Sequence, residues 1–452
     1  MYDEVKKERL FTNQQLLALL WPLIIEQALG VLVGMADTVM VSSVGEAAIS
    51  GVSLVDMINQ LIITVFGALA TGGAVVTSQH LGAKRPEEAA RSAGQLVGLS
   101  GILGTTVAAF CLVTRTAQLR LFFGTISEDV MQACLTYFTI TALSFPFLAL
   151  YNAGAAIFRS TGNSAVSMKV SVLVNAINFC GNALCVFVLR MGVAGVAVPT
   201  LVSRAVGAVI ILSLAARRDY VLRITPRTVT RLEGRTVKGI LYIGIPSAFE
   251  NSLFQLGRVL VVSMISLFGT VHISANAVAN NLDAVGCIVG NAMGLAMITV
   301  VGRCVGAQDF EQTKHYTKKL LLWDYIAQGT VNLLVLLFLN RILGMYTLSP
   351  ETRALSWTLV MIHNGVAILL WPAGFVLPNA LRAANDVRFT MLTSILSMIV
   401  WRMGLSWVLC VNMGMGAVGV WLAMVVDWIC RVTCFVIRFA SGAWQKSAVK
   451  KV

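Results

Sequence analysis

The stretch Trp21–Gly45, WPLIIEQALGVLVGMADTVMVSSVG, is apolar and long enough to cross a bilayer, yet it contains the two carboxylates Glu26 and Asp37. Part of this stretch returns 224 positions later without a gap. The residues that recur are Pro22, Glu26, Gly45, Ser50, Gly82, Ala83 and Glu87, which match Pro246, Glu250, Gly269, Ser274, Gly306, Ala307 and Glu311. A constant offset over some 66 positions indicates two copies of one unit. Asp37 has no acidic counterpart, because Val261 stands at its position, so we expect the two halves to act differently.

The composition is that of an integral membrane protein. Of the 452 residues, 57% are hydrophobic and 12% are charged, and the mean hydropathy is +0.80. This is more apolar surface than a soluble core buries. A spanning helix needs about 20 apolar residues, and about twelve such segments lie between Leu16 and Phe439. The charged first ten residues and the lack of a small-residue cleavage site predict that no signal peptide is removed.

Positive charges are distributed unevenly between alternate loops. With twelve alternating spans, 25 of the 34 Lys and Arg lie on the side of the two termini. The opposite loops hold only Arg115, Arg120, Arg190, Arg341 and Arg353. The positive-inside rule therefore predicts a multi-pass inner-membrane protein with both termini in the cytoplasm. The net charge of +13 then needs no nucleic-acid partner to explain it.

The pattern of spans predicts an all-α membrane protein with twelve transmembrane helices in two pseudo-symmetric six-helix bundles. The predicted units are a cytoplasmic lead at 1–12, an N-lobe at 13–215, a basic cytoplasmic linker at 216–238, a C-lobe at 239–439 and a cytoplasmic tail at 440–452. Because six is an even number, both lobes enter the membrane in the same sense, as a parallel repeat. In transporters of this kind the substrate site lies between the halves, near the midplane of the bilayer.

The buried acids are the first candidates for function. Glu26 and Asp37 are 11 residues apart, which places them within about 20° of one helix face and about 16 Å apart along the axis. A charged side chain inside a membrane costs at least about 2.5 kcal/mol, so such residues usually mark ion or substrate paths. The alternative is that either acid is held in a fixed hydrogen-bond network or lies near a membrane interface. Pro22 and Pro246 each precede a glutamate by one turn, which predicts a bend beside Glu26 and Glu250.

Two polar stripes lie in otherwise apolar segments. One face of the fifth span carries Asn175, Asn178 and Asn182, and one face of the eighth carries Asn276, Asn280 and Asp283. Amides can offer carbonyl oxygens to a cation and N–H groups to a carboxylate. The alternative for the Asn residues is hydrogen bonding between helices, so Asp283 is the stronger functional candidate.

The remaining polar residues suggest no further chemistry. Asp427 and Arg431 are four residues apart in the last span and are expected to neutralise each other, while Arg204, Arg258 and Arg402 are expected to balance buried acids. The nine Cys and four His (His80, His272, His315 and His363) show no metal-ligand spacing, so no metal site is predicted beyond one for Na⁺. The sequence also lacks HExxH, GxSxG and a phosphate-binding Gly-rich loop, which argues against an enzyme or an ATP-driven pump.

Seven segments together resemble one known family over nearly the full length of the chain. They are MADTVMVSSVGEAAISGVS after Pro22, QHLGAKRPEEA and its counterpart RCVGAQDFEQT, the turns FRSTGNS and LRAANDV, and the segments GVAGVAVPT and WRMGLSW. Together they resemble the MATE (multidrug and toxic compound extrusion) family. The resemblance implies two six-helix bundles around a cleft that opens alternately to either side, and antiport of organic cations against Na⁺ or H⁺.

The resemblance also assigns residues. Asp37 matches the first-helix Asp of the family's N-lobe cation site, and Asn178 and Thr200 match its fifth-helix Asn and sixth-helix Thr. Asn182 stands where some members have an Asp. Glu250 matches the seventh-helix Glu of the C-lobe site in the Na⁺-coupled branch, but the tenth-helix acid of that branch is missing from LLWPAGFVLPNAL. A lone Asp among amides can be neutralised by one H⁺, so H⁺ is favoured and Na⁺ is the alternative.

These observations predict a secondary active antiporter that exports amphipathic organic cations or drugs in exchange for H⁺ or Na⁺. The predicted coupling residues are Asp37, Asn178, Asn182, Thr200 and Glu250. The predicted residues of the substrate cleft are Glu26, Gln27, Asn280 and Asp283, and Pro22 and Pro246 are predicted to permit bending. The expected partners are small organic cations and membrane lipids. We expect no cofactor, no nucleic acid and no obligate protein partner, and a monomer.

Two other functions fit parts of the sequence. A flippase for a lipid-linked saccharide, from the related polysaccharide-exporter group, would line its cavity with cationic residues such as Arg258 and Arg402. The acids of the first, seventh and eighth spans argue against it. A scaffold or receptor that transports nothing would not need buried acids at matching positions in both halves.

Overall fold

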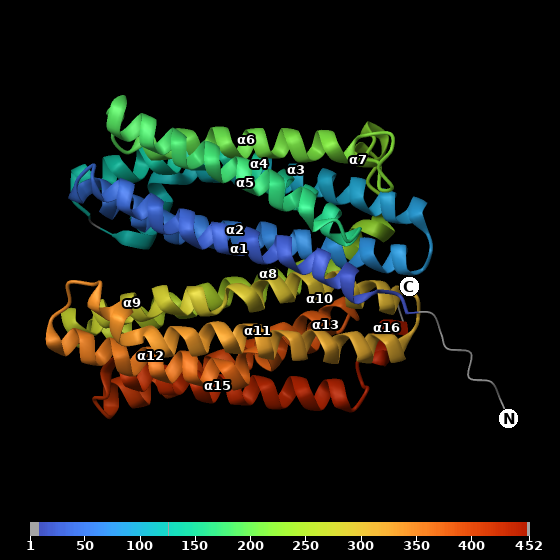
Figure 1. The fold of residues 1–452 in the computed structure, drawn as a ribbon. Helices are drawn as coiled ribbons and strands as arrows, with labels where there is room; N and C mark the ends of the chain where they lie inside the picture. Colours follow the sequence, from blue (N-terminus) through green and yellow to red (C-terminus); the bar gives the residue numbers. More distant parts are fainter. Residues whose placement is uncertain (1–8, 125, 450–452) are drawn as a thin grey trace.

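The computed structural model describes residues 9–124 and 126–449, and this part of the chain is helical and contains no β-strand (Figure 1). The first half comprises α1 (Asn13–Ser42), α2 (Glu46–Gly82), α3 (Pro86–Phe123), α4 (Glu128–Ser160), α5 (Ser164–Ala183), η1 (Leu184–Val188), α6 (Ala194–Ala215) and α7 (Pro226–Thr230). The segments labelled η are π-helical. The predicted all-α fold is confirmed.

The second half repeats this order of helices with more interruptions. It comprises α8 (Gly234–Ser266), α9 (Thr270–Gly286), α10 (Ile288–Gly306), α11 (Phe310–Gly344), α12 (Pro350–Trp371), η2 (Pro372–Val376), α13 (Leu377–Ala383), α14 (Val387–Ser397), η3 (Met398–Leu405), η4 (Val408–Asn412), α15 (Gly416–Ala440) and α16 (Gln445–Val449). The predicted lead at 1–12 and tail at 440–452 lie partly outside the described residues.

The observed helices follow the predicted spans, with three differences. Within the described residues, eleven helical segments are long and apolar enough to cross a membrane. α8 is not among them, although it is the predicted seventh span, because its middle carries polar side chains such as Glu250 and Arg258. The predicted eighth span, which carries Asn276, Asn280 and Asp283, is interrupted at Cys287, the residue between α9 and α10. α8 also begins at Gly234, inside the predicted linker at 216–238.

Local sequence signals place several helix ends. Thr12 and Gln15 form a capping box before α1, and the Ser349 side chain caps α12. Gly45 and Gly269, which are equivalent in the two copies, connect the first helix of each lobe to the second. Their φ angles are 140° and 87°, a region that residues with a Cβ rarely adopt. The repeat is therefore visible in the turns as well as in the helices.

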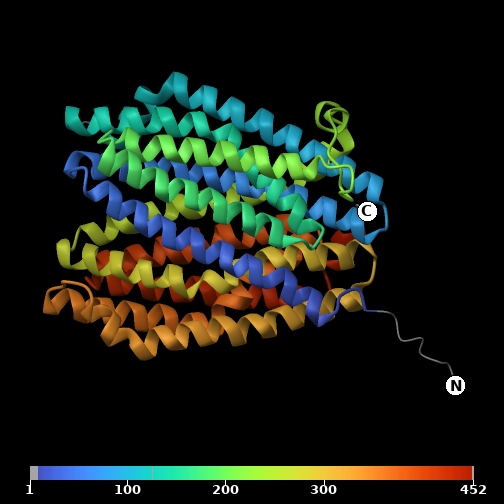
Figure 2. The same ribbon diagram turned by 45° about the horizontal axis from the view of Figure 1, so that its top comes forward.

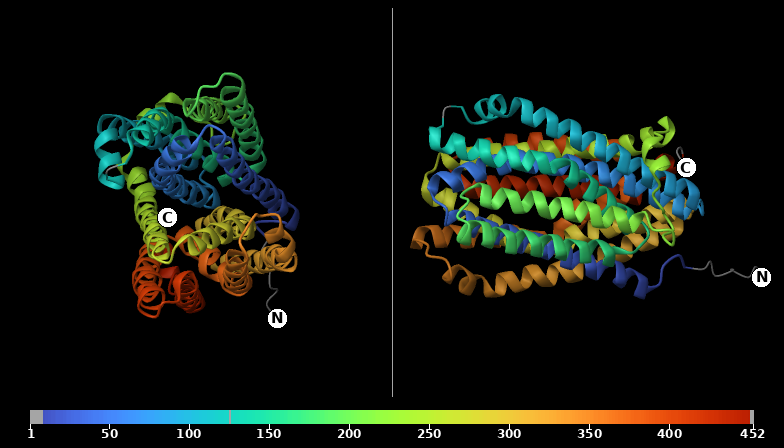
Figure 3. Two further views of the ribbon diagram at one scale, coloured as in Figure 1. Left: turned by 90° about the vertical axis from the view of Figure 1, so that its left-hand side faces the viewer. Right: turned by 90° about the horizontal axis from the view of Figure 1, so that it is seen from above.

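The helices form two lobes that lie side by side (Figures 1 and 2). Seen end-on, the blue-to-green helices α1–α6 occupy one side and the yellow-to-red helices α8–α15 occupy the other (Figure 3, left). α4 is central to the N-lobe and packs on α2, α3 and α6, while α2 also contacts α8 and α10 of the C-lobe. The linker with α7 and both described chain ends lie at one end of the bundle, which we call the linker end (Figure 1).

The two lobes meet at the linker end through glycines. A Cβ added to Gly82 would overlap the backbone carbonyl of Arg303, and a Cβ added to Gly306 would overlap the backbone carbonyl of Gln79. Gly82 and Gly306 are equivalent in the repeat, and so are Gln79 and Arg303. The contact is therefore self-complementary, like the interface of a two-fold dimer. Only glycine fits at these two positions, because the space that a Cβ would occupy is already filled by backbone atoms of the other lobe.

Hydrogen bonds between the lobes repeat the same pseudo-symmetry. Gln79 Nε2 donates to the carbonyl of Ala383, the last residue of α13, at 2.8 Å. Arg303 donates through Nε and Nη2 to the carbonyl of Ser160, the last residue of α4, at 3.2 and 2.9 Å. The last backbone carbonyls of a helix have no hydrogen-bond partner within that helix. Each lobe thus uses a side chain of its second span to donate to such a carbonyl in the other lobe.

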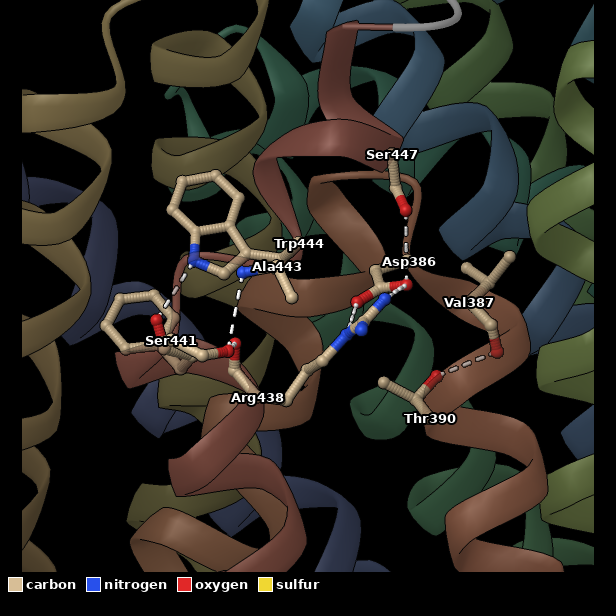
Figure 4. A network of polar contacts seen from close by, with 9 residues as sticks. Asp386, Val387, Thr390, Arg438, Ser441, Ala443, Trp444 and Ser447 are labelled. Atoms are coloured by element: carbon tan, nitrogen blue, oxygen red, sulfur yellow. Dashed lines mark hydrogen bonds and ion pairs between the residues drawn. The ribbon is translucent and has the colours of Figure 1, made fainter.

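The segment after α15 is attached to the C-lobe by a polar network (Figure 4). Arg438 Nε and Nη2 donate to Asp386 Oδ2 and Oδ1 at 2.7 and 3.0 Å, and Ser447 Oγ donates to the same carboxylate at 3.2 Å. Trp444 Nε1 donates to the carbonyl of Phe439 at 3.2 Å. The described part of the tail is therefore packed against the bundle.

We predict that Gly82→Ala and Gly306→Ala force the lobes apart at the linker end. The added methyl group meets backbone atoms, which cannot turn away as a side chain can. Overpacking of this kind costs about 1–3 kcal/mol, which shifts a two-state equilibrium by roughly 5- to 150-fold. Pulsed electron paramagnetic resonance between spin labels on cysteines introduced at Glu87 and Glu311 should report a longer distance.

Gly365→Ala is the matched control, because no atom lies within 4 Å of a Cβ built at this helical glycine. Its label distance should equal that of the unaltered protein. If the Gly82 and Gly306 variants also keep the unaltered distance, the glycine contact does not hold the linker end closed.

Candidate functional site

Four of the predicted coupling residues form one hydrogen-bonded chain in the N-lobe. Asn182 Nδ2 donates to Asp37 Oδ1 at 2.8 Å and to Asn178 Oδ1 at 3.3 Å. Asn178 Nδ2 donates to Thr200 Oγ1 at 3.0 Å, and Thr200 Oγ1 donates to the carbonyl of Val196. Asn182 and Asn178 are buried, whereas Asp37 is half-buried. The chain connects α1, α5 and α6, and Asn182 Oδ1 has no partner among the described residues.

A second N-lobe acid lies near this chain and was not found from the sequence. Asp56 of α2 accepts hydrogen bonds from Asn59 Nδ2 at 3.2 Å and from the Tyr137 hydroxyl at 3.1 Å. The charge of Asp56 acts on Asp37, and the charge of Arg204 acts on both acids. The sequence does contain a signal that could have identified it, because Asp56 is an acid within the largely apolar run GVSLVDMINQ. Arg204 Nη1 donates to Ser144 Oγ at 2.7 Å, and its role in balancing the buried acids stays a prediction.

Glu26 is held inside the N-lobe. Its Oε1 lies 3.3 Å from Arg159 Nη1 at the end of α4, and its Oε2 accepts a hydrogen bond from Ser167 Oγ at 3.0 Å. Neither Glu26 nor the half-buried Gln27 lines the two cavities described below. Their role in the substrate cleft remains a prediction. The contacts of Glu26 match the alternative stated above, in which this acid is held in a fixed hydrogen-bond network.

The C-lobe contains the equivalent ion pair. Glu250 Oε1 lies 2.8 Å from Arg382 Nη2, and Arg382 Nη1 donates to Asn379 Oδ1 at 2.7 Å. Arg159 and Arg382 occupy the same place in the matching turns FRSTGNS and LRAANDV. Each lobe therefore places a glutamate, one turn after a helix proline, against an arginine near the end of its fourth span. Pro22 and Pro246 are buried or half-buried within α1 and α8, which continue through them.

Two adjoining cavities lie between the lobes, mainly on the C-lobe side. Cavity 1 has a volume of about 250 Å³ and is lined by Glu250, Arg382 and Asn251, with Thr71 from the N-lobe. Cavity 2 has a volume of about 360 Å³, and Val31 of α1 is its lining residue from the N-lobe. The further C-lobe residues that line cavity 2 include Arg258, Asn276, Asn280, Asp283, Cys287, His363 and Arg402. Phe254 and Trp371 line both cavities.

Asp283 does not stand alone in cavity 2. His363 Nε2 of α12 lies 2.7 Å from Asp283 Oδ1, and Cys287 Sγ donates to the same oxygen at 3.1 Å. The sequence alone predicts no His as a metal ligand, but the structure brings His363 together with Asp283 and Cys287. Spacing along one segment could not reveal a cluster that two different helices bring together. Asn280 Nδ2 bonds the carbonyl of Asn276, within its own helix.

The arginines of the C-lobe fall into two groups. Arg431 Nε pairs with Asp427 Oδ1 at 3.0 Å, which confirms the predicted i, i+4 pair, and Ser397 Oγ also donates to that oxygen. Arg258 and Arg402 have no carboxylate within ion-pair distance among the described residues. Arg402 instead stacks over the ring of Phe254, with 5.3 Å to the ring centre.

α11 carries a buried polar stripe that was also missed. Asp324, Gln328 and Asn332 follow at i, i+4 and i+8 and are fully buried. Neither Asp324 oxygen has a hydrogen-bond partner among the described residues, and Asn332 Nδ2 donates to the carbonyl of Gly286 at 3.1 Å. The sequence pattern that could have revealed this stripe is the run LLLWDYIAQGTVNL, in which polar residues recur on one helix face.

We predict that Arg382→Gln destabilises the protein far more than Arg91→Gln does. Arg382 is the partner of a buried carboxylate, and removal of one member of a buried pair costs about 3–5 kcal/mol. Arg91 pairs with Glu233 on the surface, where such a pair contributes about 0–1 kcal/mol. Thermal unfolding of the purified proteins measures the difference.

The double variant Glu250→Gln/Arg382→Gln tests the reason for this loss. It should recover much of the stability, because no buried charge is then left without a partner. Equal melting temperatures for Arg382→Gln and Arg91→Gln would contradict the assignment of Arg382 as a buried counterion.

The comparisons with known proteins agree with this geometry. The MatE family model matches the chain twice, over residues 22–184 and 246–408, and the two matches are related by the same 224-residue offset as the internal repeat. The chain is 27% identical to the uncharacterized transporter YisQ of Bacillus subtilis, over 95% of this chain and 94% of that protein. It is 25% identical to the probable multidrug resistance protein NorM of Thermotoga maritima, over 97% of this chain and 94% of that protein.

Solved structures share the fold. An outward-facing conformation of a multidrug resistance MATE family transporter of the MOP superfamily superimposes with a TM-score of 0.89 at 20% identity, covering 96% of both chains. A crystal structure of MATE in the bent conformation gives 0.86 at 21% identity, covering 97% of both chains. The chain is a multi-pass membrane transporter and belongs to the MatE (MATE) family of multidrug efflux proteins.

Proposed function

We propose that this transporter is an antiporter that exports amphipathic organic cations in exchange for H⁺, with Asp37 as the residue that binds the proton. The observation that carries the proposal is the hydrogen-bonded chain Asp37–Asn182–Asn178–Thr200. It joins three helices of one lobe, so a change in the charge of Asp37 changes the hydrogen bonds that hold these helices together.

H⁺ fits Asp37 better than a larger cation does. The carboxylate has one neutral hydrogen-bond donor and no ion-pair partner within 4 Å among the described residues, so one proton neutralises it. Na⁺ is the alternative, because the unpaired Asn182 Oδ1, Asn178 Oδ1 and Thr200 Oγ1 could supply further oxygens. A direct comparison of the two ion gradients distinguishes them.

The cavities suggest how cationic substrates would be bound. The acids that line them, Glu250 and Asp283, are already paired with Arg382 and His363. A substrate cation would have to compete with these partners, so binding would release Arg382 or His363 and alter the contact between helices. Competition of this kind links substrate binding to a change of conformation.

The flippase alternative is not favoured. Arg258 and Arg402 do line cavity 2, as that alternative would require. Relatives in Thermotoga maritima and Bacillus subtilis, however, are named as probable multidrug resistance proteins. We propose that the protein lies in the cell membrane as a monomer, with the linker end in the cytoplasm.

We predict that purified protein in proteoliposomes moves a fluorescent organic cation under a pH gradient alone. Asp37→Asn should abolish this transport, because a neutral amide cannot take up and release a proton. Asp129→Asn is the matched control, since Asp129 is an exposed acid near the start of α4. Transport driven by a Na⁺ gradient and insensitive to pH would overturn H⁺ coupling, and transport under neither gradient would overturn cation antiport.

We also predict that Pro22→Ala slows turnover while it leaves drug affinity nearly unchanged. Proline inside α1 removes one backbone hydrogen bond, which makes bending beside Glu26 easier. Transport rate and equilibrium binding of the fluorescent cation, measured on the same preparation, separate the two effects. A normal turnover rate would remove the role of α1 bending from the transport cycle.

A further inference from the structure

The cluster in cavity 2 combines three kinds of metal ligand at one point. We propose that Asp283, Cys287 and His363 bind a thiophilic divalent cation of the Zn²⁺ type. The site is distinct from the Asp37 chain, which lies in the other lobe, and it does not depend on which ion drives transport.

The distances fit a shared ion. The ligand atoms of the three residues all lie within 4.8 Å of one another, and Asp283 Oδ1 is 2.7 Å from His363 Nε2 and 3.1 Å from Cys287 Sγ. A metal in their midst requires bonds of about 2.0–2.3 Å, which side-chain shifts of roughly 1 Å would allow. All three residues line cavity 2, so the fourth coordination position faces open space that water can fill.

The donor set selects the class of metal. One thiolate, one imidazole and one carboxylate are ligands that Zn²⁺ accepts together, whereas Na⁺, Mg²⁺ and Ca²⁺ prefer oxygen ligands alone. Three protein ligands with one open position resemble an exchangeable site rather than a closed structural one.

The surroundings of His363 support a ligand role. The ring packs edge-on against Trp421 and Trp428, with centre-to-centre distances of 5.5 and 4.9 Å, so its orientation is fixed. Its Nδ1 lies 3.3 Å from Asn364 Oδ1. When Nδ1 donates to this amide oxygen, the lone pair of Nε2 points at the carboxylate of Asp283. An N–H···O hydrogen bond accounts for the 2.7 Å between Nε2 and Asp283 Oδ1 while no metal is bound, and a bound metal would take the place of that proton. A hydrogen-bonded outer partner such as Asn364 is typical of metal-bound histidine.

The charged groups around the cluster do not repel a cation. The acidic groups whose charges act on Asp283 or Cys287 are Asp283 itself and Asp324, and the basic groups are Arg258 and Arg402. Equal numbers of the two signs mean that no net repulsion opposes a divalent ion. Loss of the Cys287 proton on binding would offset one of its two charges.

The position of the site predicts an effect on transport. Cys287 is the residue between α9 and α10, and His363 lies in the middle of α12. A bound ion would tie the α9/α10 junction to α12 and occupy part of cavity 2. We therefore expect metal binding to inhibit export, and this consequence alone rests on the proposed function.

Co²⁺ titration of the purified full-length protein tests the site directly. One Co²⁺ per chain should bind with a sulfur-to-cobalt charge-transfer band, and Zn²⁺ should displace it. Cys287→Ser should abolish the band. His363→Gln should weaken binding at least as much as the roughly 10- to 100-fold that loss of an outer-shell partner costs.

Matched controls keep the result interpretable. Cys180→Ser and His315→Gln replace exposed residues outside the cluster and should leave the spectrum unchanged. Cys287→His should retain the ion and lose only the charge-transfer band, which separates ligand loss from misfolding. Absence of a sulfur-to-cobalt band in the folded, unaltered protein, or an unchanged band in Cys287→Ser, would overturn the proposal. Zn²⁺ binding without inhibition of efflux would leave the site standing and overturn only its link to transport.

Discussion

The close crossing of α2 and α10 is the constraint on which the two-lobe arrangement depends. Gly82 and Gly306 each face a backbone carbonyl of the other lobe, so no side chain can be inserted there. Gln79 and Arg303 then bond the last carbonyl of a helix in the opposite lobe. Because the same element is used twice, one ancestral surface supplies both sides of the contact.

Inside the lobes, the cost of burying charge decides which residues meet. Glu26 and Glu250 are each matched by an arginine at an equivalent position, and Asp427 is matched by Arg431. The two lobes differ in the acids that lack such a partner. Asp37 accepts a hydrogen bond from the amide of Asn182, whereas Asp283 is bonded to an imidazole and a thiol. The two copies therefore share the glutamate–arginine pair and differ in their further acids, which are Asp37 and Asp56 in one lobe and Asp283 and Asp324 in the other.

Interruptions of the C-lobe helices coincide with the cavities. Cys287 separates α9 from α10 at the wall of cavity 2, and the π-helical segment η2 contributes Gly374 and Phe375 to cavity 1. Irregular backbone inside a membrane is tolerated where it is buried in protein or lines a cavity. Discontinuous helices at this depth are a common feature of binding sites in secondary transporters. The backbone and the polar side chains therefore point to the same region of the molecule.

The sequence by itself determined the fold class, the repeat and the membrane setting, because hydrophobic length, charge asymmetry and a constant offset are properties of the linear chain. It also identified Asp37, Asn178 and Asn182, and the family resemblance added Thr200; the structure joins these four residues in one chain. The partners of Glu26 and Glu250, the place of Asp56 beside Asp37 and the cluster at His363 were decided only by the tertiary structure. These residues come from helices far apart in the sequence, and a one-dimensional pattern shows which face a residue occupies but not which other helix packs against that face.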